Sequence, residues 1–174
     1  MRVARRRQAR TWGVIALAVV AGGILLFFAT RPKPEVEGVE KLANQGRGHV
    51  DTGTPVSYDS DAPTSGDHYG DSSTPCGSYT ETPDMGALVH SLEHGAVVLW
   101  YRPDVGDEVQ SSLEDIMDRY DSHVIVAPNA AIKEPVVATA WNRRLRFTDP
   151  DDPKLAEFVE TYRRRAPEDV DCPI

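Results

Sequence analysis

Cysteine is scarce in this 174-residue sequence, which contains only Cys76 and Cys172. Neither residue lies in a C-x-x-C pair, the spacing typical of cysteine zinc sites and dithiol redox motifs. The sequence also lacks the G-x-S-x-G motif of serine hydrolases, the phosphate-binding P-loop and the dinucleotide-binding glycine pattern. Because no complete catalytic motif is present, we expect a protein that binds something rather than an enzyme.

Acidic residues are absent from the first 33 positions, which carry seven basic residues. Residues 12–30 contain no charge at all. As a helix these 19 residues would span roughly 28 Å, close to the hydrocarbon thickness of a bilayer. Five arginines precede this segment, so the positive-inside rule places residues 1–11 in the cytoplasm and the remainder outside. We therefore expect a single-pass protein of the cell membrane, with a linker over 31–45.

A cleaved signal peptide has the same basic-then-apolar layout and is the alternative. A small-x-small cleavage site is missing at the end of the apolar segment, where the sequence reads Phe27-Phe28-Ala29. No cysteine lies near that end, which argues against a lipoprotein. We favour the uncleaved anchor in contact with the lipid bilayer.

The predicted extracytoplasmic domain, residues 46–174, is acidic. From residue 34 onward the sequence has 12 basic and 27 acidic residues, a net charge of −15 with histidine neutral. Such a surface repels nucleic acid and favours cationic partners or metal ions, although solubility alone would also explain it. In an oxidising compartment Cys76 and Cys172 are expected to form a disulfide. Two buried thiols or two soft metal ligands are the alternatives.

Apolar periodicity predicts an α+β domain with a small mixed or antiparallel sheet and two to three helices. The expected helices cover 84–94, 107–120 and a segment that Asp152 caps and Pro167 ends. The expected strands cover 96–101, 123–127, 136–141 and 143–147. The long segment 46–84 is rich in Gly, Pro, Ser, Thr and Asp, with one possible short strand at Val56 and Tyr58. A loop of this length is typical of a binding or disordered region.

Four of the five histidines fall within 46 residues of one another: His49, His68, His90 and His94. His90 and His94 are four residues apart, so a continuous helix places both on one face, opposite the leucine stripe. The long loop that carries the other two is the natural cover for that face. An all-histidine set suits zinc or copper best. Helix capping by His94 and loop hydrogen bonds from His68 are the structural alternatives.

The string His90-Ser-Leu-Glu93-His94 also matches the H-x-x-E-H pattern of inverted zinc proteases. Those enzymes need a further acidic ligand and a large substrate chamber, for which this short domain offers little. Glu93 lies about 60° from the histidine pair on a helical wheel. We therefore expect it to orient a ligand ring rather than to activate water.

Several of these segments together resemble the exported domain of unknown function family 3105. The resemblance rests on Gly48-His49-Val50, APTSGDHY (62–69), LVHSLEHGAVVLWY (88–101) and TAW (139–141), and covers roughly 46–147. It implies a membrane-anchored or secreted protein and brings no established activity. In the family pattern the recurring polar residues are His49, His68, His90, Glu93 and His94.

The sequence thus predicts a metal-binding module with four histidine ligands, in which Glu93 orients one of the ligand rings. Copper is slightly preferred over zinc as the bound ion. A non-enzymatic interaction protein that docks onto a membrane-protein partner is the main alternative. A metal-dependent hydrolase is a third. The position of the four imidazoles relative to one another decides between these hypotheses.

Overall fold

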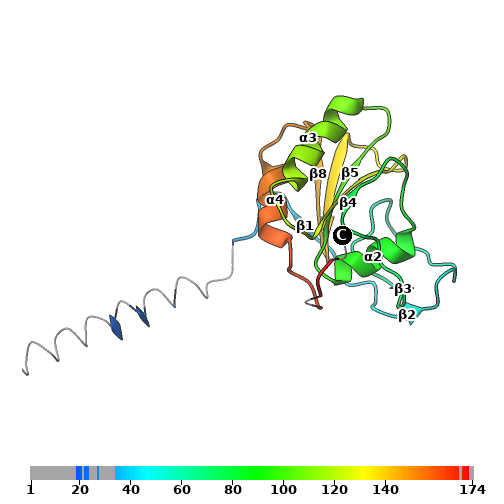
Figure 1. Ribbon diagram of the computed structural model, residues 1–174, viewed down its shortest axis with the longest axis horizontal. Helices are drawn as coiled ribbons and strands as arrows, with labels where there is room; N and C mark the ends of the chain where they lie inside the picture. Colours follow the sequence, from blue (N-terminus) through cyan, green and yellow to red (C-terminus); the bar gives the residue numbers. More distant parts are fainter. Residues whose placement is uncertain (1–18, 21, 24–26, 28–33, 169, 173–174) are drawn as a thin grey trace, which may run out of the picture. The chain divides into compact units, whose positions relative to one another are not determined.

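The structure is a computed structural model that describes residues 19–20, 22–23, 27, 34–168 and 170–172 (Figure 1). It divides the chain into two compact units, Met1–Pro34 and Glu35–Ile174. Most of the predicted membrane span, 12–30, lies outside the described residues. Among the residues that are described, no helix has the length and apolar character needed to cross a membrane.

The second unit is built on a mixed six-stranded sheet in the order β1-β8-β7-β5-β6-β4. Strand β5 pairs parallel with β6 and antiparallel with β7, while β6 pairs parallel with β4. The six strands are β1 (Glu40–Lys41), β4 (Gly77–Ser78), β5 (Val97–Tyr101), β6 (Val124–Pro128), β7 (Val136–Ala140) and β8 (Arg143–Phe147). A separate parallel pair joins β2 (His49–Val50) to β3 (His68–Tyr69).

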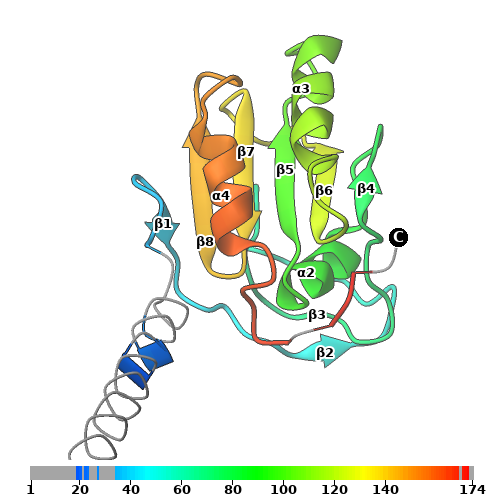
Figure 2. The ribbon, with the colours of Figure 1, turned by 60° about the vertical axis from the view of Figure 1, so that its left-hand side comes forward.

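Helices cover both faces of this sheet (Figures 1 and 2). The helices α3 (Asp107–Met117) and α4 (Lys154–Tyr162) pack on one face, where Leu113 and Phe158 join a fully buried apolar core. Helix α2 (Met85–Glu93) packs against the other face, in a core that includes Leu88 and Trp100. Because strand side chains alternate between faces, the apolar run of β5 supplies both cores. The domain is therefore α+β, with three described helices.

Most of the predicted elements are confirmed. The four predicted strands correspond to β5, β6, β7 and β8, and the three predicted helices correspond to α2, α3 and α4. Helix α2 begins where expected, because the Asp84 carboxylate accepts hydrogen bonds from the amides of Gly86 and Ala87. Asp152 likewise accepts from the Lys154 amide at the start of α4.

Three predictions are wrong. Val56 and Tyr58 form no strand; the Tyr58 hydroxyl instead donates to the Asp67 carbonyl at 2.8 Å. Helix α4 ends at Tyr162, well before Pro167, because the chain turns to pack beside Gly95. The C-terminal part of the predicted linker 31–45 belongs to the domain, since Val36 is buried in the core and β1 pairs with β8. Isolated valines among charged residues give no periodic signal.

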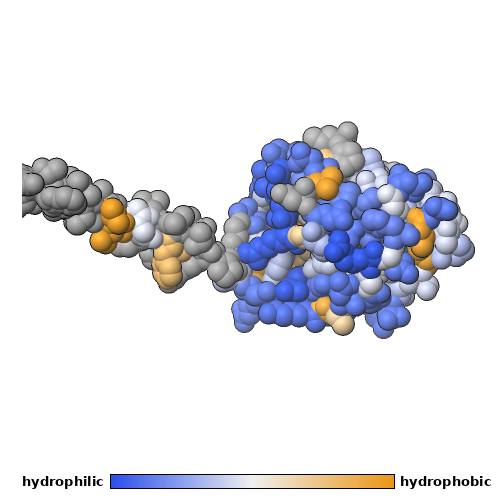
Figure 3. Space-filling view, turned by 90° about the horizontal axis from the view of Figure 1, so that it is seen from below, coloured by the Kyte–Doolittle hydropathy of each residue, from blue (hydrophilic) through white to orange (hydrophobic). Residues whose placement is uncertain are grey.

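The predicted disulfide is present between Cys76 and Cys172, whose Cα atoms lie 5.9 Å apart. The face of the domain in Figure 3 is mostly hydrophilic, with small separated apolar spots. Val170 is the one large apolar residue of the second unit that is strongly exposed among those described. On this face, polar and charged groups therefore make up most of the surface that a ligand or partner would contact.

Candidate metal centre

The parallel pair β2–β3 brings two predicted ligands together. In its register His49 stands opposite His68, and the His68 amide donates to the Gly48 carbonyl at 2.9 Å. Their ring centroids lie 4.8 Å apart. Neighbouring residues of two paired strands point to the same side of the sheet, so both rings reach toward α2. The loop between the strands is thus closed by backbone hydrogen bonds that set the imidazole positions.

Helix α2 supplies two further groups, His90 and Glu93. The His90 ring lies 5.2 Å from the His68 ring and 5.5 Å from the His49 ring, centroid to centroid. Glu93 Oε2 lies 2.9 Å from His68 Nε2 and 3.2 Å from His49 Nε2. One donor atom from each of these four residues lies within 4.8 Å of every other. A His/Glu cluster that could hold a metal ion is therefore present.

Two of the rings have their tautomer fixed by the backbone. His68 Nδ1 donates to the Gly66 carbonyl at 2.8 Å, and His90 Nδ1 donates to the Ser72 carbonyl at 3.0 Å. A carbonyl only accepts, so in each neutral ring Nε2 carries the lone pair. This is the arrangement that backbone carbonyls impose on histidines that bind a metal through Nε2.

The contact between His68 and Glu93 follows from this tautomer. Both side chains are fully buried, and His68 Nε2 faces Glu93 Oε2. With Nδ1 already protonated, Nε2 can approach a carboxylate only if the ring takes a second proton or if a cation lies between the two atoms. The pair is thus either a buried ion pair or two ligands of one ion.

Glu93 is held as an anion. Burial raises the pKa of its carboxyl, but hydrogen bonds from Arg47 and His49 and the charge of His68 outweigh burial and leave the pKa below its usual value. The Arg47 guanidinium contacts Oε1, so that Oε2 is the oxygen presented to the imidazoles. An ionised carboxylate oxygen directed into a group of imidazoles is a suitable ligand for a divalent cation.

His94, the remaining predicted ligand, is not brought into this group. Helix α2 ends at Glu93, and His94 is its C-cap residue rather than one more helical position. Its Nε2 atom lies 3.4 Å from Glu168 Oε2, although its ring is only 4.3 Å from the His90 ring. Burial and the neighbouring His90 lower its pKa, against the opposing charge of Glu168. The His90 and His94 rings are adjacent, as the i, i+4 spacing predicts, but the helix ends one residue earlier than expected and His94 Nε2 contacts Glu168 instead of the other ligands.

No sequence pattern indicates the outer hydrogen-bond partners of the four-residue group. Arg47, Glu168 and the carbonyls of Gly66 and Ser72 all support its side chains, yet they are ordinary residues of loops and tail. Only the tertiary structure brings them together. Their distances from Glu93 along the chain, 46 residues for Arg47 for example, exceed any local pattern.

A family model now accounts for most of the chain. Residues 49–173 match the model of the protein family of unknown function DUF3105. The chain belongs to the DUF3105 family. The match begins at His49 and includes all four residues of the cluster. No curated protein and no solved structure gives a match.

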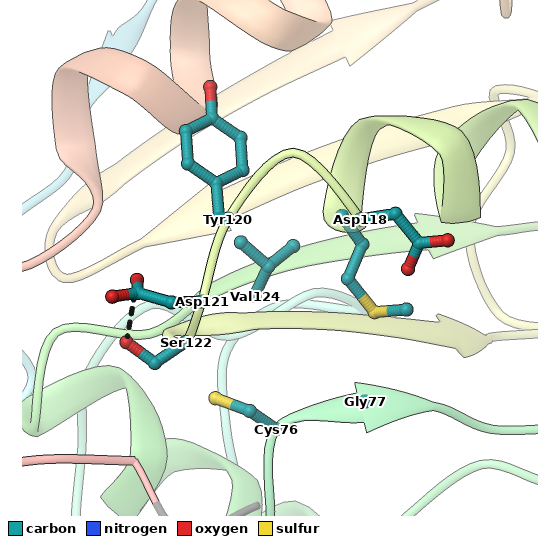
Figure 4. Close-up of a pocket in the computed structure, with 8 residues that line it drawn as sticks. Cys76, Gly77, Asp118, Tyr120, Asp121, Ser122 and Val124 are labelled. Carbon is teal, nitrogen blue, oxygen red and sulfur yellow. Dashed lines mark hydrogen bonds between the residues drawn. The ribbon is translucent and has the colours of Figure 1, made fainter.

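A second feature of the DUF3105 domain is a pocket of about 140 Å³ beside the disulfide (Figure 4). Cys76, Asp118, Tyr120, Asp121 and Ser122 are among its lining residues, and the Ser122 hydroxyl donates to Asp121 at 3.3 Å. Its lining includes no imidazole. This pocket is therefore distinct from the His/Glu cluster.

Proposed function

We propose that this chain is a membrane-anchored extracytoplasmic protein whose domain binds one divalent transition-metal ion through His49, His68, His90 and Glu93. The observation that carries the proposal is the pair of Nε2 lone pairs, fixed by backbone carbonyls, beside a buried carboxylate. A buried carboxylate facing an imidazole lone pair is costly without a cation or proton to compensate it. A metal ion supplies that compensation without requiring a charged histidine.

The donor set favours Zn²⁺ or Cu²⁺. Imidazole nitrogen suits both ions, and a carboxylate oxygen is a common zinc ligand. Thiolate is unavailable, because both cysteines form the disulfide. Met85, the nearest thioether in sequence, packs against the core that contains Leu88 and Trp100. A site without sulfur ligands disfavours Cu⁺, so copper would bind here in its divalent form.

Binding rather than catalysis is supported by the number of protein ligands. Four donors complete a tetrahedral zinc site, whereas catalytic zinc sites keep one position for water. The His49 side chain is 47% exposed while the His68 and Glu93 side chains are fully buried. One ligand at the solvent edge gives an ion a route in and out. Storage, delivery or sensing of metal outside the membrane fits this arrangement.

Metal analysis of the full chain tests the proposal. The chain, purified in detergent and stripped of metal, is incubated with Zn²⁺ or Cu²⁺, desalted and analysed for metal content. We expect about one equivalent in the wild type and much less in His90→Ala after desalting, because the three remaining donors no longer close the site and release the ion more readily. His94→Ala is the matched control and should retain the ion.

A wild-type chain that retains neither ion would refute metal binding. Equal losses in His90→Ala and His94→Ala would instead return His94 to the ligand set.

The anchor rests on the uncharged segment 12–30 and its flanking arginines. Alkaline extraction of membranes that contain the full chain tests it. A spanning segment keeps the chain in the membrane pellet, and release into the supernatant would contradict the proposal.

A further inference from the structure

Two chain segments form hydrogen bonds with helix α2 and Gly95, next to His90 and Glu93 of the metal centre. The first is Ser72–Cys76. Its Ser72 carbonyl accepts from His90 Nδ1 at 3.0 Å, and its Thr74 carbonyl accepts from the Ser91 hydroxyl at 2.7 Å. The Thr74 amide donates to the Ala87 carbonyl at 3.1 Å. This segment therefore sets the orientation of the His90 ring directly.

The second segment comes from the C-terminal end of the chain, after α4. The Arg164 amide donates to the Gly95 carbonyl at 2.8 Å, and the Glu168 amide donates to the Glu93 carbonyl at 3.2 Å. The approach is close, since a Cβ at Gly95 would lie 2.9 Å from Arg164 Cα. The Glu168 carboxylate also contacts Arg47, the residue that holds Glu93 Oε1. This segment thus supports the backbone and the carboxylate of Glu93.

The disulfide joins these two segments. Cys76 lies four residues after Ser72, and Cys172 lies four residues after Glu168. His123 contacts both sides of the junction: its amide donates to Cys76 Sγ and its Nε2 donates to the Val170 carbonyl, each at 3.0 Å. We call the two segments with their disulfide the clasp. The clasp encloses the end of α2 that carries His90 and Glu93.

We propose that the Cys76–Cys172 disulfide is a positioning device for the metal centre, which slows the release of the ion by keeping the clasp closed around α2. The inference rests on the proposed metal-binding function. A segment held by few hydrogen bonds and few apolar contacts opens readily unless it is tied down. Among the described residues between Glu168 and Cys172, the hydrogen bond that holds the segment is the one that the Val170 carbonyl accepts from His123, and the Val170 side chain is exposed. The covalent bond therefore carries most of the restraint.

Opening the clasp should weaken the hydrogen bonds that orient the His90 ring and those that hold Glu93. Loss of a partner that orients a metal ligand typically lowers metal affinity by about 10- to 100-fold. None of the four ligands is removed, so the ion should still bind. The expected signature is a faster release with unchanged stoichiometry.

The test compares the full chain in detergent with its Cys76→Ser/Cys172→Ser variant. Zn²⁺ release to a chelating dye is followed in time, and the Cu²⁺ form is examined by electron paramagnetic resonance. We expect release to accelerate about tenfold and the Cu²⁺ spectrum to change, as for a loosened ligand set. Leu113→Ala, in the core on the other face, is the control for general destabilisation and should leave both readouts unchanged.

A second pair of variants keeps the disulfide intact. Glu168→Pro removes both the carboxylate and the amide N–H that bonds Glu93, whereas Glu168→Ala removes only the carboxylate. We expect faster zinc release from the proline variant than from the alanine variant. Wild-type release rates in the cysteine variant, or equal acceleration in Leu113→Ala, would overturn the clasp. A wild-type chain that never binds zinc would instead refute the proposed function.

Discussion

The α3–α4 face of the central sheet and the C-terminal end of helix α2 are stabilised in different ways. On the face that carries α3 and α4, buried apolar side chains such as Leu113 and Phe158 make the contacts. Around the C-terminal end of α2, the segment Ser72–Cys76 and the segment after α4 bond to the helix through backbone carbonyls and amides. Apolar packing tolerates substitution by side chains of similar volume and shape. A hydrogen bond, in contrast, is lost when its donor or acceptor atom is removed. The apolar core under α3 and α4 and the metal centre are thus located in separate parts of the domain.

The most severe test of this separation is the truncation of a large buried side chain on the face that α4 covers. Phe158 is fully buried, and Phe158→Ala should cost about 3–5 kcal/mol of unfolding free energy through the cavity it leaves. Chemical denaturation measures that loss. Zinc affinity of the fraction that remains folded should stay within about threefold of wild type, because distant sites act nearly independently.

Phe158→Leu is the control for this prediction, since it keeps much of the buried volume and should cost less than the alanine variant. A large drop in zinc affinity in folded Phe158→Ala would show that the two faces are coupled.

The same contrast explains what the sequence could predict. The strands and the helices of the sheet follow from apolar periodicity, because continuous runs such as that of β5 are buried on both faces. Convergence of His49, His68 and His90 was expected from the length of the loop and the position of α2. The strand pair that aligns His49 with His68 has only two residues on each side, too few for a periodic signal.

The role of Glu93 could not be read from helical spacing. A wheel pairs His90 with His94, and their rings are indeed adjacent, yet it is Glu93 and not His94 that contacts His49 and His68. Arg47 then directs one carboxylate oxygen toward the histidines. Both facts depend on contacts between residues that are distant in sequence.

A smaller but more local effect is expected at the contact between α2 and β3. Gly86 has room for no side chain, because a Cβ there would lie 2.8 Å from the Tyr69 ring. Gly86→Ala should cost about 1–3 kcal/mol through overpacking, which exceeds the roughly 1 kcal/mol that alanine gains over glycine in a helix. Since Tyr69 follows His68 directly, we expect this variant, unlike Phe158→Ala, also to weaken zinc binding. Thermal unfolding and zinc titration measure the two effects.

Adding Tyr69→Leu to Gly86→Ala removes the ring and should recover part of the lost stability. If Gly86→Ala alone proves as stable as wild type, the close approach of α2 and β3 is not a constraint.

The smallest effect is expected at the start of α2, far from the metal-facing end. The Asp84 carboxylate accepts from the amides of Gly86 and Ala87, so Asp84→Ala should cost about 1 kcal/mol of unfolding free energy. Asp84→Asn keeps an acceptor oxygen and should cost less, which separates the hydrogen bonds from the charge. Zinc affinity should hardly change in either variant, because the clasp and the contacts of His49 and His68 with Glu93 hold the opposite end of the helix. A zinc affinity that falls in step with stability across both variants would instead mean that α2 responds as one rigid unit and that its two ends are not supported separately.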